Sequence, residues 1–347
     1  MKVRNLLVCA AFALLLCGCS DGKNGVTGNS AAEAKREIFA MDTVMYVTAY
    51  GDNAQAAVDA AAAEISRLDA LLSVGSDSSE ISRLNSTGKG ELSADTKYLV
   101  ERSLEFYGTT DGAYDMTVSP LMELWGFTGT SPAVPDESDI QKTLARCGSD
   151  KISLSGSSIS LGEAGGIDLG GIAKGYTGDR IMKIYSEYGV TSGMISLGGN
   201  VQCYGAKPDG SMWRCGITDP LHPYENDRFL GIVSIRGKAV VTSGGYERSF
   251  TENGHTYHHI MDMKTGYPAE SGLISVTIVS SDGTKADALS TACFVMGAEK
   301  AADYWRRYGD DFDIIMQTDT GRIMVTEGLA SAFECTEPFE IIKKTGS

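Results

Sequence analysis

Two side chains in the last quarter of the chain have the types and the spacing of a metal site. Asp287 and Thr291 are four residues apart, so they share one face of a helix predicted over residues 286–296. A carboxylate and a hydroxyl near a helix start suit a hard cation such as Mg²⁺, which prefers oxygen ligands and bridges phosphate groups. The alternative is that Asp287 only caps the helix and that Thr291 has no role.

A glycine-rich segment at residues 163–176 has the composition of a phosphate-binding turn. Its glycines and Asp168 lie between a predicted strand at residues 159–161 and a predicted helix over residues 172–188. The backbone N–H groups at a helix start attract anions, and Lys174 adds a positive charge one turn further on. The alternative is a tight turn in which the glycines only satisfy unusual backbone angles. The segment has neither the Gly-Lys-Ser/Thr of a P-loop nor the G-x-G-x-x-G spacing of a Rossmann fold.

A third candidate for chemistry is His259, whose ordinary pKa lies near neutrality and suits a general base. The alternative is a structural histidine beside a strand. His258 and His259 are poor candidates for a metal pair, because neighbours on a strand point to opposite faces. An aromatic and a carboxylate at Tyr114 and Asp115, close to Pro120, could line a cleft that binds a ring, or could anchor a loop.

The elements that must position these residues follow from hydrophobic periodicity. Helices are predicted over residues 53–72, 94–107, 136–147, 172–188, 286–296 and 298–308. Strands are predicted over residues 37–50, 194–200, 213–218, 229–235, 239–242, 274–280, 312–317 and 322–326, with a hairpin over 151–161. Three glycine-rich turns follow strands, which favours a site at one edge of a sheet. Without repeats or an internal linker, the chain is predicted to form a single mixed α/β globular domain of the α+β class.

The N-terminus has the features of a bacterial lipoprotein signal. A basic start, an apolar run over residues 6–16 and the sequence Leu16-Cys17-Gly18-Cys19 predict a signal peptide over residues 1–18 and lipidation of Cys19. The alternative is an ordinary signal peptide with incidental cysteines. Residues 19–36 are predicted to form the lipidated start and a flexible tether, and residues 37–345 the folded domain. The chain is expected to be exported and to be anchored by lipid to the bacterial cell membrane, facing the periplasm or the outer side.

Composition excludes several classes of function. The formal net charge is −15, from 30 Lys and Arg against 45 Asp and Glu, which argues against nucleic-acid binding and electrostatic adhesion to membranes. The five cysteines beyond the signal region are too scattered for a zinc site or a disulfide framework. Cys203 and Cys215 could pair across a hairpin, or remain buried free thiols.

Seven blocks of the sequence, taken together and in order, resemble the ApbE family, the FAD:protein FMN transferases. The blocks extend from about residue 38 to residue 297, behind the lipoprotein signal. They are Met41-Asp42-Thr43, Tyr114-Asp115-x-Thr117-Val118-x-Pro120-Leu121, Asp168-Leu169-Gly170-Gly171-Ile172-Ala173-Lys174-Gly175-Tyr176, Ser196-Leu197-Gly198-Gly199-Asn200, Ser243-Gly244-x-Tyr246-Glu247-Arg248, His259-Ile260-x-Asp262-x-x-Thr265-Gly266-x-Pro268 and Ala286-Asp287-Ala288-Leu289-Ser290-Thr291-Ala292.

The resemblance implies a domain of the ApbE, T-fold-like type that binds FAD in an extended cleft with Mg²⁺ on its pyrophosphate. It implies FAD contacts from Met41, Ala113, Tyr114, Asp115, Asp168, Lys174 and the backbone near Ile260. It also implies metal contacts from Asp287, Thr291 and the carbonyl of Gly171, with Ser290 beside them. The chain departs from many members after the first helix, where Val74-Gly75 replaces an aromatic residue, and at Met263, which replaces a proline.

The implied reaction transfers the FMN part of FAD to a Ser or Thr hydroxyl of a partner flavoprotein, with formation of a phosphoester and release of AMP. In this reaction the protein positions groups and neutralises charge. His259 or a nearby carboxylate would take the proton of the hydroxyl, and His259 is the preferred candidate. Two alternatives use the same residues. One is an Mg²⁺-dependent FAD pyrophosphatase that gives FMN and AMP, and the other is a flavin-binding lipoprotein without catalysis.

Overall fold

The computed structural model describes residues 32–129, 131–223, 225 and 228–344. The predicted signal peptide, Cys19 and the tether up to residue 31 lie outside these residues, so their predictions stay untested. Within the described part of the chain, no helix is both long and apolar enough to cross a membrane.

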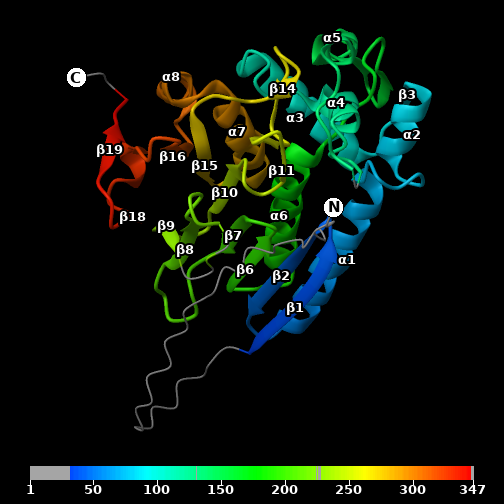
Figure 1. Ribbon diagram of the computed structural model, residues 1–347. Coiled ribbons are helices and arrows are strands. Elements are labelled where there is room, and N and C mark those ends of the chain that lie inside the picture. Colours follow the sequence, from blue (N-terminus) through cyan, green and yellow to red (C-terminus); the bar gives the residue numbers. More distant parts are fainter. Residues whose placement is uncertain (1–31, 130, 224, 226–227, 345–347) are drawn as a thin grey trace, which may run out of the picture.

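A nine-stranded sheet runs through the described part of the chain (Figure 1). Its strands, in spatial order, are β1 (Glu33–Ala40), β2 (Thr43–Tyr50), β6 (Ser192–Leu197), β7 (Asn200–Tyr204), β10 (Ala239–Gly244), β15 (Leu273–Ser280), β16 (Phe312–Thr318), β17 (Ile323–Thr326) and β19 (Phe339–Ile342). Neighbouring strands are antiparallel except for β17 and β19.

Smaller sheets and the helices complete the described fold. One smaller sheet contains β18 (Phe333–Glu334), β9 (Phe229–Ile235) and β8 (Trp213–Thr218), and another contains β3 (Lys89–Glu91), β5 (Ser158–Ser160) and β4 (Ser153–Ser155). Two further sheets are hairpins, formed by β11 (Ser249–Glu252) with β12 (His255–His258) and by β13 (Met261–Asp262) with β14 (Tyr267–Pro268). The helices are α1 (Ala54–Leu72), α2 (Glu80–Thr87), α3 (Ala94–Thr109), α4 (Ser119–Leu124), α5 (Glu137–Leu144), α6 (Gly170–Glu187), α7 (Gly283–Met296) and α8 (Ala298–Tyr308), with 3₁₀ turns η1 (Met116–Val118), η2 (Ser149–Lys151) and η3 (Glu327–Leu329).

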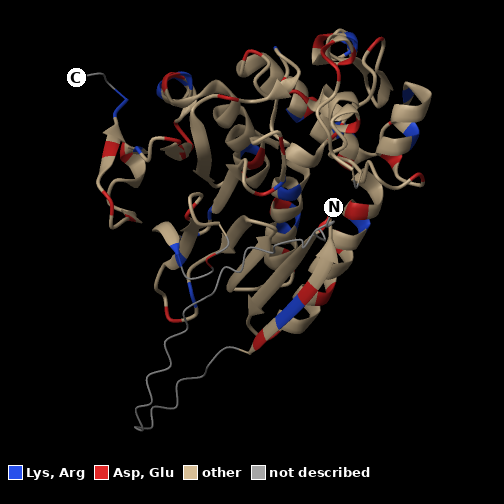
Figure 2. Cartoon of the chain, in the orientation of Figure 1, with Lys and Arg blue, Asp and Glu red and all other residues tan. Residues whose placement is uncertain are grey.

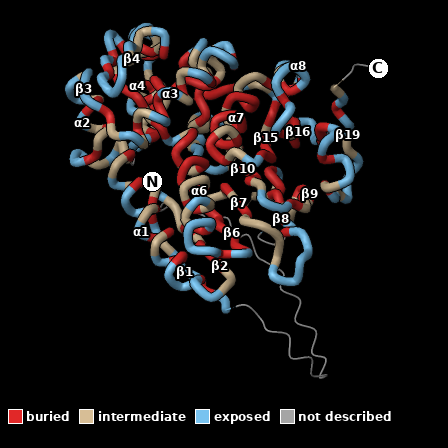
Figure 3. The backbone as a smooth tube through the Cα atoms, turned by 180° about the vertical axis from the view of Figure 1, so that it is seen from behind, coloured by how far each residue is buried: buried red, intermediate tan, exposed pale blue. Residues whose placement is uncertain are grey.

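The large sheet is covered on both faces, which explains its apolar central strands. Val241 and Ile278 pack into the core that contains α7, whereas their neighbours Val240 and Val279 pack against β8 and β9. Because successive side chains of a strand point to opposite faces, both sides of β10 and β15 are buried. Figure 2 shows no charged residue along these two strands, and Figure 3 shows α7 buried within the molecule. The prediction of one mixed α/β domain is confirmed.

The N-terminal strand differs from its prediction. Instead of one strand over residues 37–50, the chain forms a hairpin of β1 and β2, joined by Met41 and Asp42. These two residues have φ values of 49° and 59°, the left-handed conformation required by a two-residue hairpin turn. Alternating side chains cannot reveal such a turn, since neither residue is glycine. Strand β1 also begins at Glu33, so residues 33–36 belong to the sheet and not to the predicted tether.

Candidate functional site

Three turns of the large sheet meet at one edge. Met41 and Asp42 join β1 to β2, Gly198 and Gly199 join β6 to β7, and β10 ends at Gly244. The pairing of β2 with β6, of β6 with β7 and of β7 with β10 brings these three turns to the same side. The N-terminal half of α7 reaches this edge as well, because Asn200 at the start of β7 contacts it.

Helices α6 and α7 approach each other closely at glycines. A Cβ atom on Gly175 would lie 2.1 Å from the carbonyl oxygen of Gly283 and 2.7 Å from the Cβ of Asp287. Only glycine permits this approach. Helix α6 begins at Gly170, so Gly171, predicted in the turn before the helix, lies in its first turn, whereas Gly175 lies inside the helix as predicted. The role of Gly175 in helix packing belongs to neither of the two interpretations of the glycine-rich segment.

The carboxylate of Asp287 lies at this helix crossing. It accepts hydrogen bonds from the backbone N–H of Gly175 at 2.8 Å and from Nδ2 of Asn200 at 3.0 Å. Its side chain is nearly inaccessible, with 4% of the residue surface exposed. The alternative role as a helix cap is wrong, because Asp282 caps α7 by accepting from the N–H of Lys285 at 2.7 Å. Asp287 is therefore held by α6 and β7, and not by the backbone at the start of its own helix.

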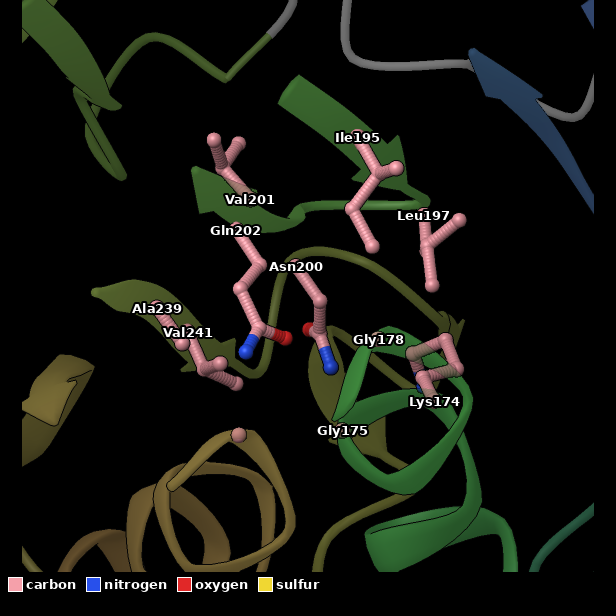
Figure 4. Close-up of a pocket in the computed structure, with 11 residues that line it drawn as sticks. Lys174, Gly175, Gly178, Ile195, Leu197, Asn200, Val201, Gln202, Ala239 and Val241 are labelled. Carbon is pink, nitrogen blue, oxygen red and sulfur yellow. The ribbon is translucent and has the colours of Figure 1, made fainter. Parts of the chain in front are cut away.

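A buried polar layer holds the strand and the two helices in place around Asp287. Asp179 accepts from Nε2 of Gln202 at 2.9 Å, from the N–H of Gly283 at 2.9 Å and from Oγ1 of Thr284 at 2.6 Å. Burial raises the pKa of Asp179, and these donors oppose the rise. Figure 4 shows Asn200 and Gln202 extending from β7 toward α6, where they line a small cavity.

The four predicted metal-binding residues lie together at the helix crossing. A Cβ atom on Gly171 would be 3.8 Å from Oγ1 of Thr291. The hydroxyl of Ser243, from β10, is 2.7 Å from Oγ of Ser290 and 3.4 Å from Oγ1 of Thr291. Ser290 also donates to the backbone carbonyl of Asp287 at 2.8 Å. Residues from α6, α7 and β10 thus place several oxygen atoms in one small region.

The chemistry of this donor set fits a hard cation. It consists of one carboxylate, two hydroxyls and one backbone carbonyl, which are the ligand types of Mg²⁺. Among the residues that the structure describes, no group of three or more His, Cys, Asp and Glu side chains could hold a metal. A cation bound here would therefore need oxygen atoms from water or from a ligand phosphate to complete its coordination.

Charged side chains of both signs flank the helix crossing. Half-buried Asp168 accepts from the N–H of Gly170 at 2.8 Å. Burial raises the pKa of Asp168, while this hydrogen bond and the positive charges of Arg248 and Lys174 lower it. The guanidinium of Arg248 donates to the backbone carbonyl of Phe127. The two cations and Asp168 thus lie close enough to interact.

Glu247 adds a titratable group to this charged region. Its residue surface is in contact with solvent, but the surrounding protein atoms partly desolvate its carboxyl group. This desolvation raises the pKa of Glu247 to about 7, with a further rise from Asp287 and an opposing effect of Lys174. The carboxylate also lies 3.6 Å from the position of a Cβ on Gly199. Glu247 therefore changes charge near neutral pH at the same sheet edge.

His259 is held in one tautomer beside these charges. Its Nδ1 lies 3.2 Å from the carbonyl oxygen of Arg248, which also accepts from the backbone N–H of His259 at 3.1 Å. A carbonyl only accepts, so the proton of the neutral ring is on Nδ1 and the lone pair is on Nε2. Burial lowers the pKa of His259 to about 3, helped by Arg248, His258 and Lys174. The ring is thus neutral at pH 7.

Two predicted FAD contacts lie at the ends of loops at this edge. The backbone N–H of Met41 donates to Asp69 at 3.0 Å, and its sulfur lies 3.9 Å from Oγ1 of Thr177 on α6. Ile260 is buried, and its carbonyl accepts from the N–H of Ala269 at 2.9 Å. The backbone conformation at both positions is therefore fixed by the protein itself.

The predicted contact segment 113–115 uses its polar side chains internally. The carboxylate of Asp115 accepts from Oγ1 of Thr117 at 2.8 Å and from Oγ of Ser149 at 2.6 Å. Tyr114 is 3% exposed, and its ring lies beneath Gly171, 3.3 Å from the position of a Cβ there. Contacts from Tyr114 and Asp115 to a ligand would thus come from their backbone. Ala113, the residue before them, is half-buried.

Comparison with known proteins identifies the family. The model of the ApbE family matches residues 41–316, which is most of the chain. The chain belongs to the ApbE family.

Relatives and solved structures of the ApbE family cover nearly the whole chain. It is 33% identical over 326 residues to the FAD:protein FMN transferase of Treponema pallidum (strain Nichols), covering 87% of each protein. It is 30% identical over 333 residues to that of Salmonella typhimurium, covering 90% of this chain and 93% of the relative. The crystal structure of the ApbE protein from Thermotoga maritima superposes with a TM-score of 0.80 at 32% identity, covering 86% of this chain and 98% of that one. The crystal structure of the apo flavinyl transferase ApbE from Pseudomonas stutzeri superposes with a TM-score of 0.76 at 26% sequence identity. It covers 88% of this chain and 98% of that one.

Several residues of this ApbE site were not singled out from the sequence. Asp179 and Gln202 act through contacts between elements that are distant in the chain, and Asn200, Glu247 and Arg248 were noted only within matching blocks. Asn200 had a detectable signal, because it is a polar residue directly after the Gly198-Gly199 pair at a strand end. Asp179 had no detectable signal in the sequence, since a polar residue on a predicted helix is ordinarily expected to be exposed.

Proposed function

We propose that this chain is an FAD:protein FMN transferase, which moves the FMN part of FAD to a Ser or Thr hydroxyl of an acceptor flavoprotein and releases AMP. The observation that carries the proposal is the arrangement of Asp287, Thr291 and Gly171 at the α6–α7 crossing, beside Lys174. The names of the Treponema and Salmonella relatives support it.

The proposal includes a magnesium ion held by Asp287, Thr291 and the carbonyl of Gly171, with Ser290 next to them. When bound there, Mg²⁺ would neutralise pyrophosphate charge and make the phosphoryl group more electrophilic. Asn200 supports this arrangement by fixing the Asp287 carboxylate at 3.0 Å. The internal donors leave Asp287 as an oriented, charged acceptor at the crossing.

Lys174 and Arg248 would add positive charge for the pyrophosphate. Both interact with Asp168, whose carboxylate is fixed by the N–H of Gly170. Fixed cations stabilise the charge that develops on the departing AMP without reorganisation at the moment of reaction. The negative charge of Asp168 limits the net positive charge of the free site.

His259 would take the proton from the acceptor hydroxyl. Its neutral ring presents an unprotonated Nε2, because Nδ1 donates to the carbonyl of Arg248. The new bond joins the hydroxyl oxygen to the phosphorus of the FMN phosphate, and the bond from that phosphorus to the AMP oxygen breaks. The product is a phosphoester on the acceptor.

The proposal also concerns location and partner. The N-terminal sequence ending in Leu16-Cys17-Gly18-Cys19 supports export and lipid attachment at Cys19, so the acceptor would be an exported or membrane flavoprotein. The lipid, and not surface charge, would hold the chain at the membrane, since the net charge is −15.

The test uses the detergent-solubilised full chain with FAD, Mg²⁺ and an exported flavoprotein acceptor, followed by intact-mass spectrometry. We expect the acceptor to gain the mass of one FMN, and the gain to disappear with EDTA and with an acceptor whose target hydroxyl is removed. Free FMN and AMP beside an unmodified acceptor would instead identify a pyrophosphatase. Bound, unchanged FAD would identify a binding lipoprotein.

A further inference from the structure

Two cysteines lie next to each other between β7 of the large sheet and β8 of the small sheet. Cys203 is 1% exposed and Cys215 is 6% exposed, and both belong to the apolar layer between the two sheets. Both side chains face this layer, and Cys215 lies close enough to Cys203 to raise the pKa of the Cys203 thiol. Figures 1 and 3 show the molecule from opposite sides, and β7 lies beside β8 in both views.

The other described cysteines have different surroundings. Cys335 donates to the carbonyl of Leu230 at 2.9 Å, and Cys147 donates to that of Thr143 at 3.4 Å. Cys293 is fully buried within the core around α7. All five described cysteines are free thiols in this structure. The Cys203–Cys215 pair therefore combines proximity, burial and a thiol neighbour.

We propose that Cys203 and Cys215 are a disulfide site, oxidised when the chain folds outside the cytoplasm. Each thiol loses one hydrogen, a sulfur–sulfur bond forms, and the two electrons and two protons reduce the disulfide of a thiol–disulfide oxidoreductase to a dithiol. The sequence predicts export, and exported compartments favour such oxidation. The proposal depends on export and is independent of the transferase reaction.

The order of events follows from burial. The proximity of Cys215 and burial raise the pKa of Cys203, so little thiolate is present in the folded chain and exchange is slow. Oxidation must therefore precede the packing of β8 against β7, and the finished disulfide is then protected from reductants. The bond would restrain β7, whose first residue, Asn200, holds Asp287.

Tryptic mapping separates the two cysteines. Trypsin cleaves after Arg214, between them, but not after Lys207, which precedes Pro208. The full chain is exported in a bacterial host, alkylated with iodoacetamide in denaturant without reductant, and digested. We expect peptides 184–214 and 215–228 to be linked and to separate after reduction, with a gain of two hydrogen atoms. Alkylation of both cysteines in the exported, folded protein would overturn the proposal.

Variants provide the matched control. Cys203→Ser and Cys215→Ser should each abolish the linked peptides, make the remaining cysteine reactive in denaturant and lower the melting temperature. Cys335→Ser, in the same apolar layer, should keep the link. If a variant fails to fold, the wild-type chain decides the question: its melting temperature should fall only after reduction in denaturant and refolding with reductant. An unchanged melting temperature together with alkylated thiols would count against the disulfide.

Discussion

The backbone N–H of Gly175 on α6 donates a 2.8 Å hydrogen bond to the carboxylate of Asp287 on α7. In a regular helix this N–H would pair with the carbonyl of Gly171, four residues earlier. Asp287 therefore competes with that carbonyl for its donor, which favours contact of Gly171 with another partner. One short contact thus connects helix packing with the proposed metal ligands.

Replacement of Asp287 by alanine should affect both activity and stability. We expect loss of detectable Mg²⁺-dependent transfer, and destabilisation by about 1–3 kcal/mol because two buried donors lose their acceptor. Denaturant unfolding and a thermal-shift titration with Mg²⁺ and FAD separate the two effects. Asp282→Ala removes the cap of the same helix and should reduce stability while the Mg²⁺ response persists. A full Mg²⁺ response in Asp287→Ala would exclude the proposed ligand.

Replacement of Gly175 by alanine should force α6 and α7 apart. The added Cβ would lie 2.1 Å from the carbonyl oxygen of Gly283, so we expect a loss of about 1–3 kcal/mol and a large loss of activity. Gly108→Ala is the control, because Gly108 lies in α3 with no atom within 4 Å of its added Cβ. Gly108→Ala should raise the free energy of unfolding by about 0.5–1 kcal/mol. Equal effects of the two changes on the unfolding midpoint would contradict the packing role.

Glu247 should make FAD binding depend on pH near neutrality. Its pKa is about 7, so the carboxyl group becomes negative as pH rises through 7 and repels the pyrophosphate of FAD. We expect affinity to weaken several-fold between pH 6 and pH 8, measured by flavin fluorescence, and Glu247→Gln to remove this dependence. In the folded chain this carboxyl group keeps its proton up to about pH 7, whereas in the unfolded chain it loses the proton near its ordinary pKa of 4.5. The free energy of unfolding should therefore fall as pH rises from 4.5 to about 7. An unchanged pH profile in Glu247→Gln would exclude this role.

His259→Gln should lower the transfer rate by about 10²-fold or more, as expected for loss of a general base. The exposed His255 on β12 provides the control, and His255→Gln should keep the wild-type rate. The lowered pKa of His259 predicts a second effect. As pH falls from 6.5 to about 3, the unfolded ring binds a proton before the folded ring does, so stability falls. Unfolding midpoints of the variant should decline less over this range.

Cys19→Ser should prevent lipidation and leave an unprocessed precursor that no longer fractionates with membranes. Cys17→Ser changes a cysteine two residues earlier and should leave the attachment intact. The measurement is membrane fractionation with intact mass of the purified chain. Membrane association of the Cys19→Ser chain would show that another segment provides the anchor.

The sequence predicted the elements with strong periodicity, and it proposed metal-binding residues that the fold brings together at the α6–α7 crossing. Helix α8 and strands β8 and β9 have the predicted boundaries, because long apolar patterns and flanking turn residues define them. The β1–β2 turn differs from the prediction, since two consecutive left-handed residues without glycine are uncommon and Met41 has no tendency toward such angles. Helical spacing indicated Asp287 and Thr291, and the glycine-rich segment indicated Lys174.

By itself, the sequence determined the family, the mixed α/β class and the residues whose chemistry suits a flavin pyrophosphate. Only the tertiary structure decided what the glycines of α6 do and what surrounds Asp287. The physical reason is that side-chain types and short periodicities are local properties of the chain. The approach of Gly175 to Gly283, and the contact of Asn200 with Asp287, join residues about a hundred positions apart, and only packing of the sheet and helices brings them together.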